Sequence, residues 1–280
     1  MPYVAEISRA NPSCFVFLID QSGSMQDPFG STTGNKTKAD SLADAINRLL
    51  QNLVIKCAKS EGIRDYYHVG VIGYGGKGVG PAFSGKLRGK DLVPISEIGN
   101  NPARVEERTK RVEDGAGGLV EQKVKFPIWF DPQAEGGTPM CDALHRATSI
   151  LVNWLTKHPN CFPPIVINIS DGESTDGDPF QAAYDLMTLS SSDGDVLLFN
   201  LHLSSSNERP IEYPDTDAIL PDDHAKLLFN MSSPLPEYMR KMLSQEGMSG
   251  SFNTRGFVFN ADMVSVIRFL DIGTRPSNLR

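Results

Sequence analysis

Residues 14–20 read CFVFLID, a run of six apolar residues that ends in a carboxylate. An apolar run of this length is typical of a strand that is buried on both faces of a parallel sheet. The run IVINISD at 165–171 has the same pattern and also ends in Asp. Because ligands bind at the carboxyl ends of parallel strands, the two runs predict a sheet with Asp20 and Asp171 at its functional edge.

Strands and helices alternate along the rest of the chain. Apolar residues recur at helical spacing in 38–59, and further elements are expected at 67–74 (strand), 140–154 (helix), 180–189 (helix), 195–203 (strand), 235–245 (helix), 255–259 (strand) and 261–270 (helix). This alternation predicts an α/β fold with a doubly wound (Rossmann-like), mostly parallel central sheet, one antiparallel edge strand, and helices on both faces. We expect residues 1–280 to form a single domain, with insertions at about 75–135 and 204–254.

The first insertion is expected to contain a short charged helix at about 102–112 and a strand at 120–130. Pro127 cannot donate a hydrogen bond to a neighbouring strand, so this strand should lie at a sheet edge. The basic residues between Arg104 and Arg111 alternate with glutamates. We interpret them as a solvated helix face.

The composition limits the kinds of partner that the chain can bind. The net charge of −7 leaves no basic surface for nucleic-acid phosphates. The apolar runs are far shorter than the roughly 20 residues that span a bilayer, and the first thirteen residues lack the apolar segment of a signal peptide. The four cysteines have no CxxC spacing, which indicates buried thiols. We therefore expect a cytoplasmic protein that binds neither nucleic acid nor membrane.

Polar residues follow the two apolar strands and a glycine-rich loop. Asp20 is followed by Ser22 and Ser24, the GGTP loop supplies Thr138, and the second strand supplies Asp171. Two carboxylates and three hydroxyls form an all-oxygen set, which hard cations prefer. We expect these five residues to bind Mg²⁺, with Mn²⁺ or Ca²⁺ as alternatives. The two carboxylates balance the charge of the ion, so an Asp or Glu of a partner protein can replace one of its waters.

These motifs, FLIDQSGSM, EGGTPM and INISDGES, resemble the metal-ion-dependent adhesion site of the von Willebrand factor A family, in its intracellular bacterial type. The resemblance covers about 13–271. It implies that Ser22 and Ser24 bind the metal directly, that Thr138 and Asp171 bind it directly or through water, and that Asp20 acts through water and hydrogen bonds. It also implies a metal-dependent protein-interaction module that captures an acidic residue. Bacterial stress or signalling systems are a further association of the family.

The chain has no GxSxG, P-loop or HExxH motif, so we expect no enzymatic activity. One alternative is a Mg²⁺-dependent phosphatase-like hydrolase of the haloacid-dehalogenase type, but Ser22 stands where that family needs a second carboxylate. Another alternative is a scaffold with a purely structural metal. Self-association stays open as well, since carboxylates of the acidic loop 204–223 could reach the metal of a neighbouring molecule.

Overall fold

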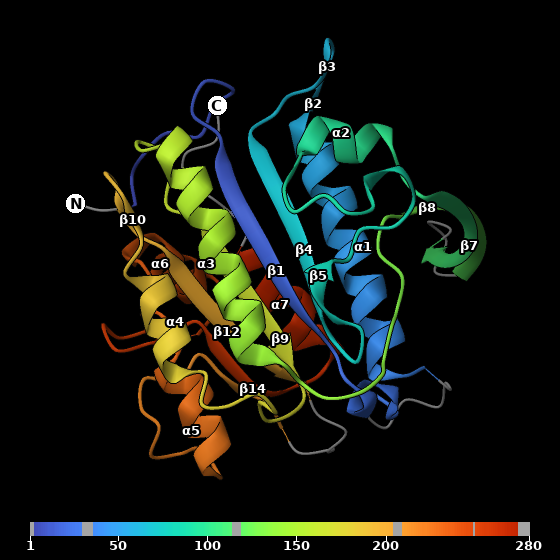
Figure 1. Ribbon diagram of the computed structural model, residues 1–280. Coiled ribbons are helices and arrows are strands. Elements are labelled where there is room, and N and C mark those ends of the chain that lie inside the picture. Colours follow the sequence, from blue (N-terminus) through green and yellow to red (C-terminus); the bar gives the residue numbers. More distant parts are fainter. Residues whose placement is uncertain (1–2, 30–35, 114–118, 204–208, 249, 274–280) are drawn as a thin grey trace.

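The computed structural model describes residues 3–29, 36–113, 119–203, 209–248 and 250–273. Its centre is a mixed sheet with the strand order β13-β14-β12-β9-β1-β4-β5 (Figure 1). The parallel strands are β14 (Phe257–Ala261), β12 (Leu197–Leu203), β9 (Ile165–Ser170), β1 (Ser13–Gln21) and β4 (Tyr67–Gly75). The antiparallel strands are β13 (Ile211–Glu212), β5 (Gly78–Pro81) and β6 (Val93–Pro94).

The fold is therefore α/β with a mostly parallel central sheet. The expectation of one antiparallel edge strand was wrong, because antiparallel strands flank the sheet on both sides. β13 pairs with β14 at one edge, and β5 and β6 both pair with β4 at the other. These strands are only two to four residues long. Short edge strands limit the open backbone that a sheet presents to other chains.

Helices cover both faces of the sheet (Figure 1). Side chains alternate along β1: Phe15, Phe17 and Ile19 belong to the core beneath α1 (Lys38–Cys57) and α7 (Met263–Gly273). Val16 and Leu18 belong to the opposite core. The helices of that second core are α3 (Met140–Lys157), α4 (Phe180–Met187) and α5 (Asp223–Asn230). The apolar run of β1 is thus buried on both faces, as its sequence predicts.

The remaining elements are shorter. They are η1 (Gly23–Gln26), η2 (Gly85–Leu87), α2 (Ile95–Asn100), α6 (Glu237–Gln245), and the small paired strands β2 (Ala58–Lys59), β3 (Gly62–Ile63), β10 (Ser190–Ser191) and β11 (Gly194–Asp195). Among the described residues, no helix is long and apolar enough to cross a membrane.

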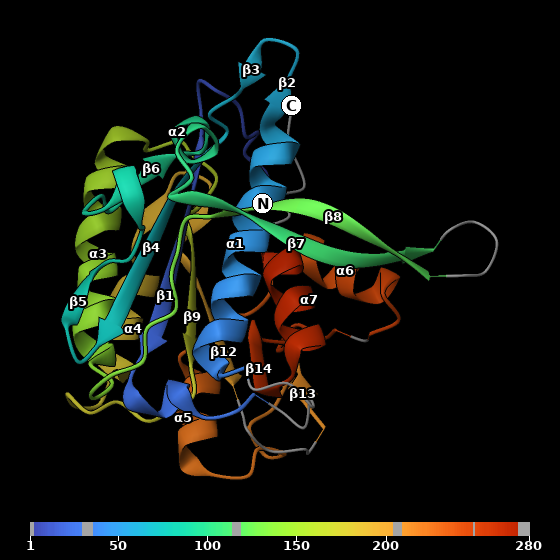
Figure 2. The same cartoon turned by 90° about the vertical axis from the view of Figure 1, so that its right-hand side faces the viewer.

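A long two-stranded hairpin, β7 (Arg104–Glu113) and β8 (Leu119–Ile128), extends away from the sheet (Figure 2). The helix expected at 102–112 was therefore wrong. Ten consecutive cross-strand pairs with β8 outweigh the weak helical preference of this charged segment. Arg108 anchors the hairpin, since its guanidinium lies 3.9 Å from the Phe126 ring and 2.8 Å from a carboxylate oxygen of Asp44 on α1. Pro127 lies in an edge strand, as predicted.

The strand order reverses between β1 and β9: the chain runs from β1 to β4 on one side and from β9 to β12 and β14 on the other. The loops that follow β1 and β9 consequently leave the sheet in opposite directions. Such a point opens a crevice at the carboxyl ends of the strands, where open α/β sheets bind ligands. Asp20 is the penultimate residue of β1, and Asp171 follows the last residue of β9.

Candidate functional site

The structure brings the five predicted residues together at this edge. Asp20, Ser22 and Ser24 lie at and after the end of β1, Asp171 follows β9, and Thr138 lies just before α3. With Lys38, they form what we term the carboxyl-edge cluster.

Two glycine contacts position the GGTP loop, one against the loop after β1 and one against Gly76, which follows β4. The Gly23 amide donates a 2.8 Å hydrogen bond to the carbonyl of Gly136. Gly136 has a φ of +74° and lies so close to the backbone of Gly76 that a Cβ would collide with it. This position therefore requires glycine. The close approach of the loops places Thr138 beside the end of β1.

The hydroxyls and one carboxylate of the cluster lie within contact of one another. The Ser24 hydroxyl donates a 2.6 Å hydrogen bond to Asp171 Oδ1, and the Ser22 and Ser24 hydroxyl oxygens are 3.0 Å apart. Thr138 Oγ1 and Ser24 Oγ each lie 3.9 Å from the position that a Cβ on Gly172 would take. The Thr138 hydroxyl makes no hydrogen bond with the described part of the chain, whereas its backbone is held by Thr175. Three hydroxyls and Asp171 thus face one small region.

Asp20 lies behind this group. One carboxylate oxygen accepts a 2.8 Å hydrogen bond from the Ser22 amide, and the other accepts a 2.7 Å bond from the Ser170 hydroxyl. The side chain is buried. Burial raises the pKa of Asp20, and the hydrogen bonds from Ser22 and Ser170 oppose that rise. Asp20 therefore orients the loop and adds negative charge behind the hydroxyls.

Lys38 is the member of the cluster that the sequence analysis missed. Its ammonium lies 2.7 Å from Asp171 Oδ2 and 3.7 Å from a carboxylate oxygen of Asp27. The Lys38 side chain is 5% exposed and that of Asp171 is fully buried. One signal was present: Lys38 begins α1, and a cation at a helix N-terminus is unfavourable for the helix dipole. A lysine at that position needs a compensating carboxylate nearby.

The cluster is left with an excess of negative charge. Two buried carboxylates, Asp20 and Asp171, face a single buried ammonium. No group of three or more His, Cys, Asp or Glu side chains that could hold a metal ion occurs within the described residues. The donor set of this edge is thus two carboxylates and three hydroxyls, with one ammonium among them.

No protein-family model matches the chain, and no curated protein matches it. Among solved structures, it is similar to the PilB minor pilin of Streptococcus sanguinis, with 11% identity and a TM-score of 0.43, over 98% of this chain and 62% of that chain. It is also similar to three N-terminal domains of the type V pili tip protein Mfa5 of Porphyromonas gingivalis, with 16% identity and a TM-score of 0.30, over 59% of this chain and 20% of that chain. This chain thus spans less than two thirds of either. With TM-scores below 0.5, neither similarity extends to function.

The assignment to the von Willebrand factor A family was wrong. No family model supports it, and the described residues contain no metal-holding group of three acidic, His or Cys side chains. The physical reason is that short Asp/Ser strings also form turns at the ends of buried strands. Here, moreover, an ammonium contacts the second aspartate.

Further predictions fall with that assignment. The metal-dependent module that captures an acidic residue is not supported, and neither is its phosphatase-like alternative or a role in bacterial stress or signalling. The predicted cytoplasmic location is withdrawn with that assignment; the two similar structures are of pilus components, and their likeness assigns no location to this chain.

Proposed function

We propose that the carboxyl-edge cluster is a cation site in a non-catalytic domain. Mg²⁺ is the expected ion, with Mn²⁺ or Ca²⁺ as alternatives, and Asp20, Ser22, Ser24, Thr138 and Asp171 would hold it. The observation that carries the proposal is the spacing of the oxygens: Ser22 Oγ to Ser24 Oγ is 3.0 Å and Ser24 Oγ to Asp171 Oδ1 is 2.6 Å. Adjacent ligands of an octahedral ion at about 2.1 Å are about 3.0 Å apart, so these oxygens need little movement.

The charge of the site supports the same proposal. The two buried carboxylates exceed the single ammonium of Lys38 by one negative charge. A divalent ion would balance both carboxylates if the ammonium withdrew. The hydroxyls add no charge. The Thr138 hydroxyl has no hydrogen-bond partner within the described residues, so its oxygen is available for a hard cation.

Lys38 makes the proposal specific. Its ammonium contacts Asp171 Oδ2, so ion and ammonium compete for one carboxylate. Mg²⁺ binding is then an exchange of cations and not the filling of an open site. Beyond Asp171, the displaced ammonium has Asp27 within 3.7 Å, whose side chain is 58% exposed.

Calorimetric titration with MgCl₂ tests the site. The wild-type chain should bind one ion. Lys38→Met should bind it about tenfold or more tightly, because no ammonium then competes for Asp171; a tenfold ratio corresponds to about 1.4 kcal/mol. Ser22→Ala/Ser24→Ala should lose binding. The matched control is Lys59→Met, which removes an exposed lysine on β2 and should leave the affinity unchanged. An absence of Mg²⁺ binding in both wild type and Lys38→Met would contradict the proposal.

We also propose that the sheet is doubly wound and that residues 1–280 form one domain. The reversal of strand order between β1 and β9 supports the first point, together with helices on both faces. The net charge of −7 supports a domain that binds no nucleic acid.

A further inference from the structure

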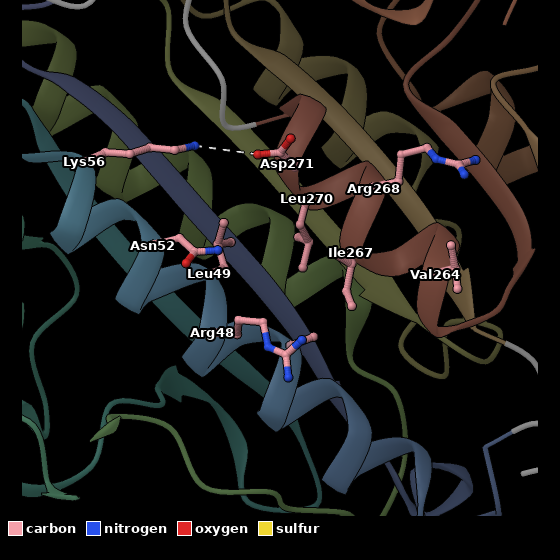
Figure 3. Close-up of a pocket in the computed structure, with 10 residues that line it drawn as sticks. Arg48, Leu49, Asn52, Lys56, Val264, Ile267, Arg268, Leu270 and Asp271 are labelled. Atoms are coloured by element: carbon pink, nitrogen blue, oxygen red, sulfur yellow. Dashed lines mark ion pairs between the residues drawn. The ribbon is translucent and has the colours of Figure 1, made fainter. Parts of the chain in front are cut away.

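A groove runs between α1 and α7 on the face of the molecule that is opposite α3 (Figures 2 and 3). Its volume is about 290 Å³, and Leu49, Val264, Ile267 and Leu270 line it. Val264 is 63% exposed and Ile267 is 40% exposed. A second pocket of about 370 Å³ shares Ile267 with the first and continues along the same seam. The seam therefore exposes apolar side chains along two helices.

The rim of this groove is cationic. Arg48 and Lys56 lie on the α1 side, and Arg268 lies on the α7 side. Lys56 is 3.6 Å from Asp271, and Arg268 is 2.7 Å from Glu212. The Arg48 guanidinium has no hydrogen bond or ion pair within the described residues. In a chain with a net charge of −7, an apolar groove beside such a cation favours a ligand with apolar side chains and carboxylates.

One segment of the chain has this chemistry. Residues 215–223 read DTDAILPDD, with four aspartates and no basic residue. Ile219 is 58% exposed within this loop, next to the buried Leu220. Asp223 is also exposed. The loop follows Glu212, which contacts Arg268 on α7, and leads away from there into α5 at the bottom of Figures 1 and 2.

We propose that two copies of this chain associate head to tail, with loop 215–223 of one copy in the α1–α7 groove of the other. Ile219 would enter the apolar floor beside Val264 and Ile267, and the aspartates would face Arg48. Because the two surfaces are made of different residues, each copy keeps a free groove or a free loop after pairing. A contact of this kind continues from copy to copy in rings or open chains. The association does not depend on the cation site.

Sedimentation velocity over a concentration series tests the proposal. The wild-type chain should gain mass as its concentration rises, and added salt should reduce that gain, because the charged rim is solvent-exposed. Arg48→Glu alters only the groove and Ile219→Asp alters only the loop. Each variant alone should weaken association about tenfold or more. Val152→Asp is the matched control, since Val152 is 47% exposed on α3 and lies outside both surfaces.

Mixing the two variants gives the decisive result. An Arg48→Glu copy keeps its loop and an Ile219→Asp copy keeps its groove, so an equimolar mixture should form heterodimers and nothing larger. A mixture that stays monomeric overturns the proposal, as does a wild-type chain that stays monomeric at every concentration. If either single variant associates as strongly as the wild-type chain, the proposal is also overturned, because the contact would then lie elsewhere.

Discussion

Two polar networks lie near the same strands but differ in charge. The first is inside the sheet: Tyr74 donates to Asn168 Oδ1 at 2.7 Å, Asn168 donates to Asn200 Oδ1 at 2.9 Å, and Asn200 donates to the Ser232 hydroxyl at 2.9 Å. All of these groups are neutral and buried. The second network is the carboxyl-edge cluster, which contains two carboxylates and one ammonium.

The difference separates a polar network that serves packing from one that can serve binding. In the neutral network, Asn168 on β9 finds its partner in the neighbouring strand β12, Asn200 finds its partner in Ser232 after α5, and the series ends on the Leu228 carbonyl. A fully satisfied network of this kind rigidifies a core and has no reason to take a ligand. The cluster keeps an excess charge and a hydroxyl, that of Thr138, without a partner in the described chain. Cation binding would therefore change the cluster and leave the neutral network as it is.

The largest expected effect comes from breaking the ion pair in the cluster. Asp171→Asn should lower the free energy of unfolding by about 3–5 kcal/mol, because it leaves the buried Lys38 ammonium with only the exposed carboxylate of Asp27, at 3.7 Å. Urea denaturation measures this loss. The double variant Lys38→Met/Asp171→Asn should regain most of it, since neither member of this ion pair is then left charged without the other. A double variant no more stable than Asp171→Asn would show that the pair is not what the fold depends on.

A smaller loss is expected from the neutral network. Asn168→Ala leaves Asn200 Oδ1 without its donor and the Tyr74 hydroxyl with only the Ile169 carbonyl at 3.4 Å, which should cost about 2–3 kcal/mol in urea denaturation. Tyr74→Phe, which removes only one hydroxyl, should cost about 1 kcal/mol. Neither variant should change the affinity for Mg²⁺. A changed affinity in Asn168→Ala would mean that the two networks act as one.

The smallest effect concerns pH. Burial lowers the pKa of His202 to about 4, with the neighbouring His224 as a second cause. Its Nδ1 accepts a hydrogen bond from the Asn260 amide at 3.3 Å, and its ring stacks on Phe259 at 4.6 Å. The unfolded chain takes up this proton as the pH falls below about 6.5, whereas the folded chain takes it up only near pH 4. Stability that is present above about pH 6.5 is therefore lost between those two values.

For His202 this loss should reach about 1–2 kcal/mol between pH 7 and pH 5. Urea denaturation at the two pH values measures it, and His202→Phe should flatten the difference. His202 lies between the two networks. It follows Asn200 of the neutral network by two residues on β12, and it pairs with Ser170, whose hydroxyl donates to Asp20 of the carboxyl-edge cluster. An unchanged pH dependence in His202→Phe would assign the effect to other groups.

Much of the fold could be predicted from the sequence, because local patterns decide it. The expected helix at 38–59 is α1 at Lys38–Cys57, and the expected strand at 67–74 is β4 at Tyr67–Gly75. The expected strand at 120–130 is β8 at Leu119–Ile128, but its partner β7 could not be predicted, because this charged strand gains its stability from pairing with β8 and not from an apolar face. The antiparallel edge strands are only two to four residues long, too short to leave a pattern.

For the site, the sequence predicted that the five polar residues would lie together, but it did not predict that Lys38 would contact them. Asp20 and Asp171 follow apolar runs, so their place at one edge is a consequence of parallel strands. The acidic residue Glu208 of the loop 204–223 lies outside the described residues. Lys38 was not predicted as a member of the cluster, because its contact with Asp171 depends on tertiary placement: 133 residues separate the two. The role of the five residues as metal ligands stays a prediction.

The residues that meet in the carboxyl-edge cluster are far apart in the sequence, and this affects how the chain folds. β1 pairs with β4 on one side and β9 on the other, and Asp20 meets Ser170 across 150 positions of sequence. Contacts of such long range slow folding, because a large loop must close before they form. Until β9 has been synthesised, β1 lacks one neighbour, and the partners Ser170 and Asp171 do not yet exist. An emerging chain thus exposes the apolar run 14–19 of β1 while β9 is still missing, at the stage when aggregation competes most strongly with folding.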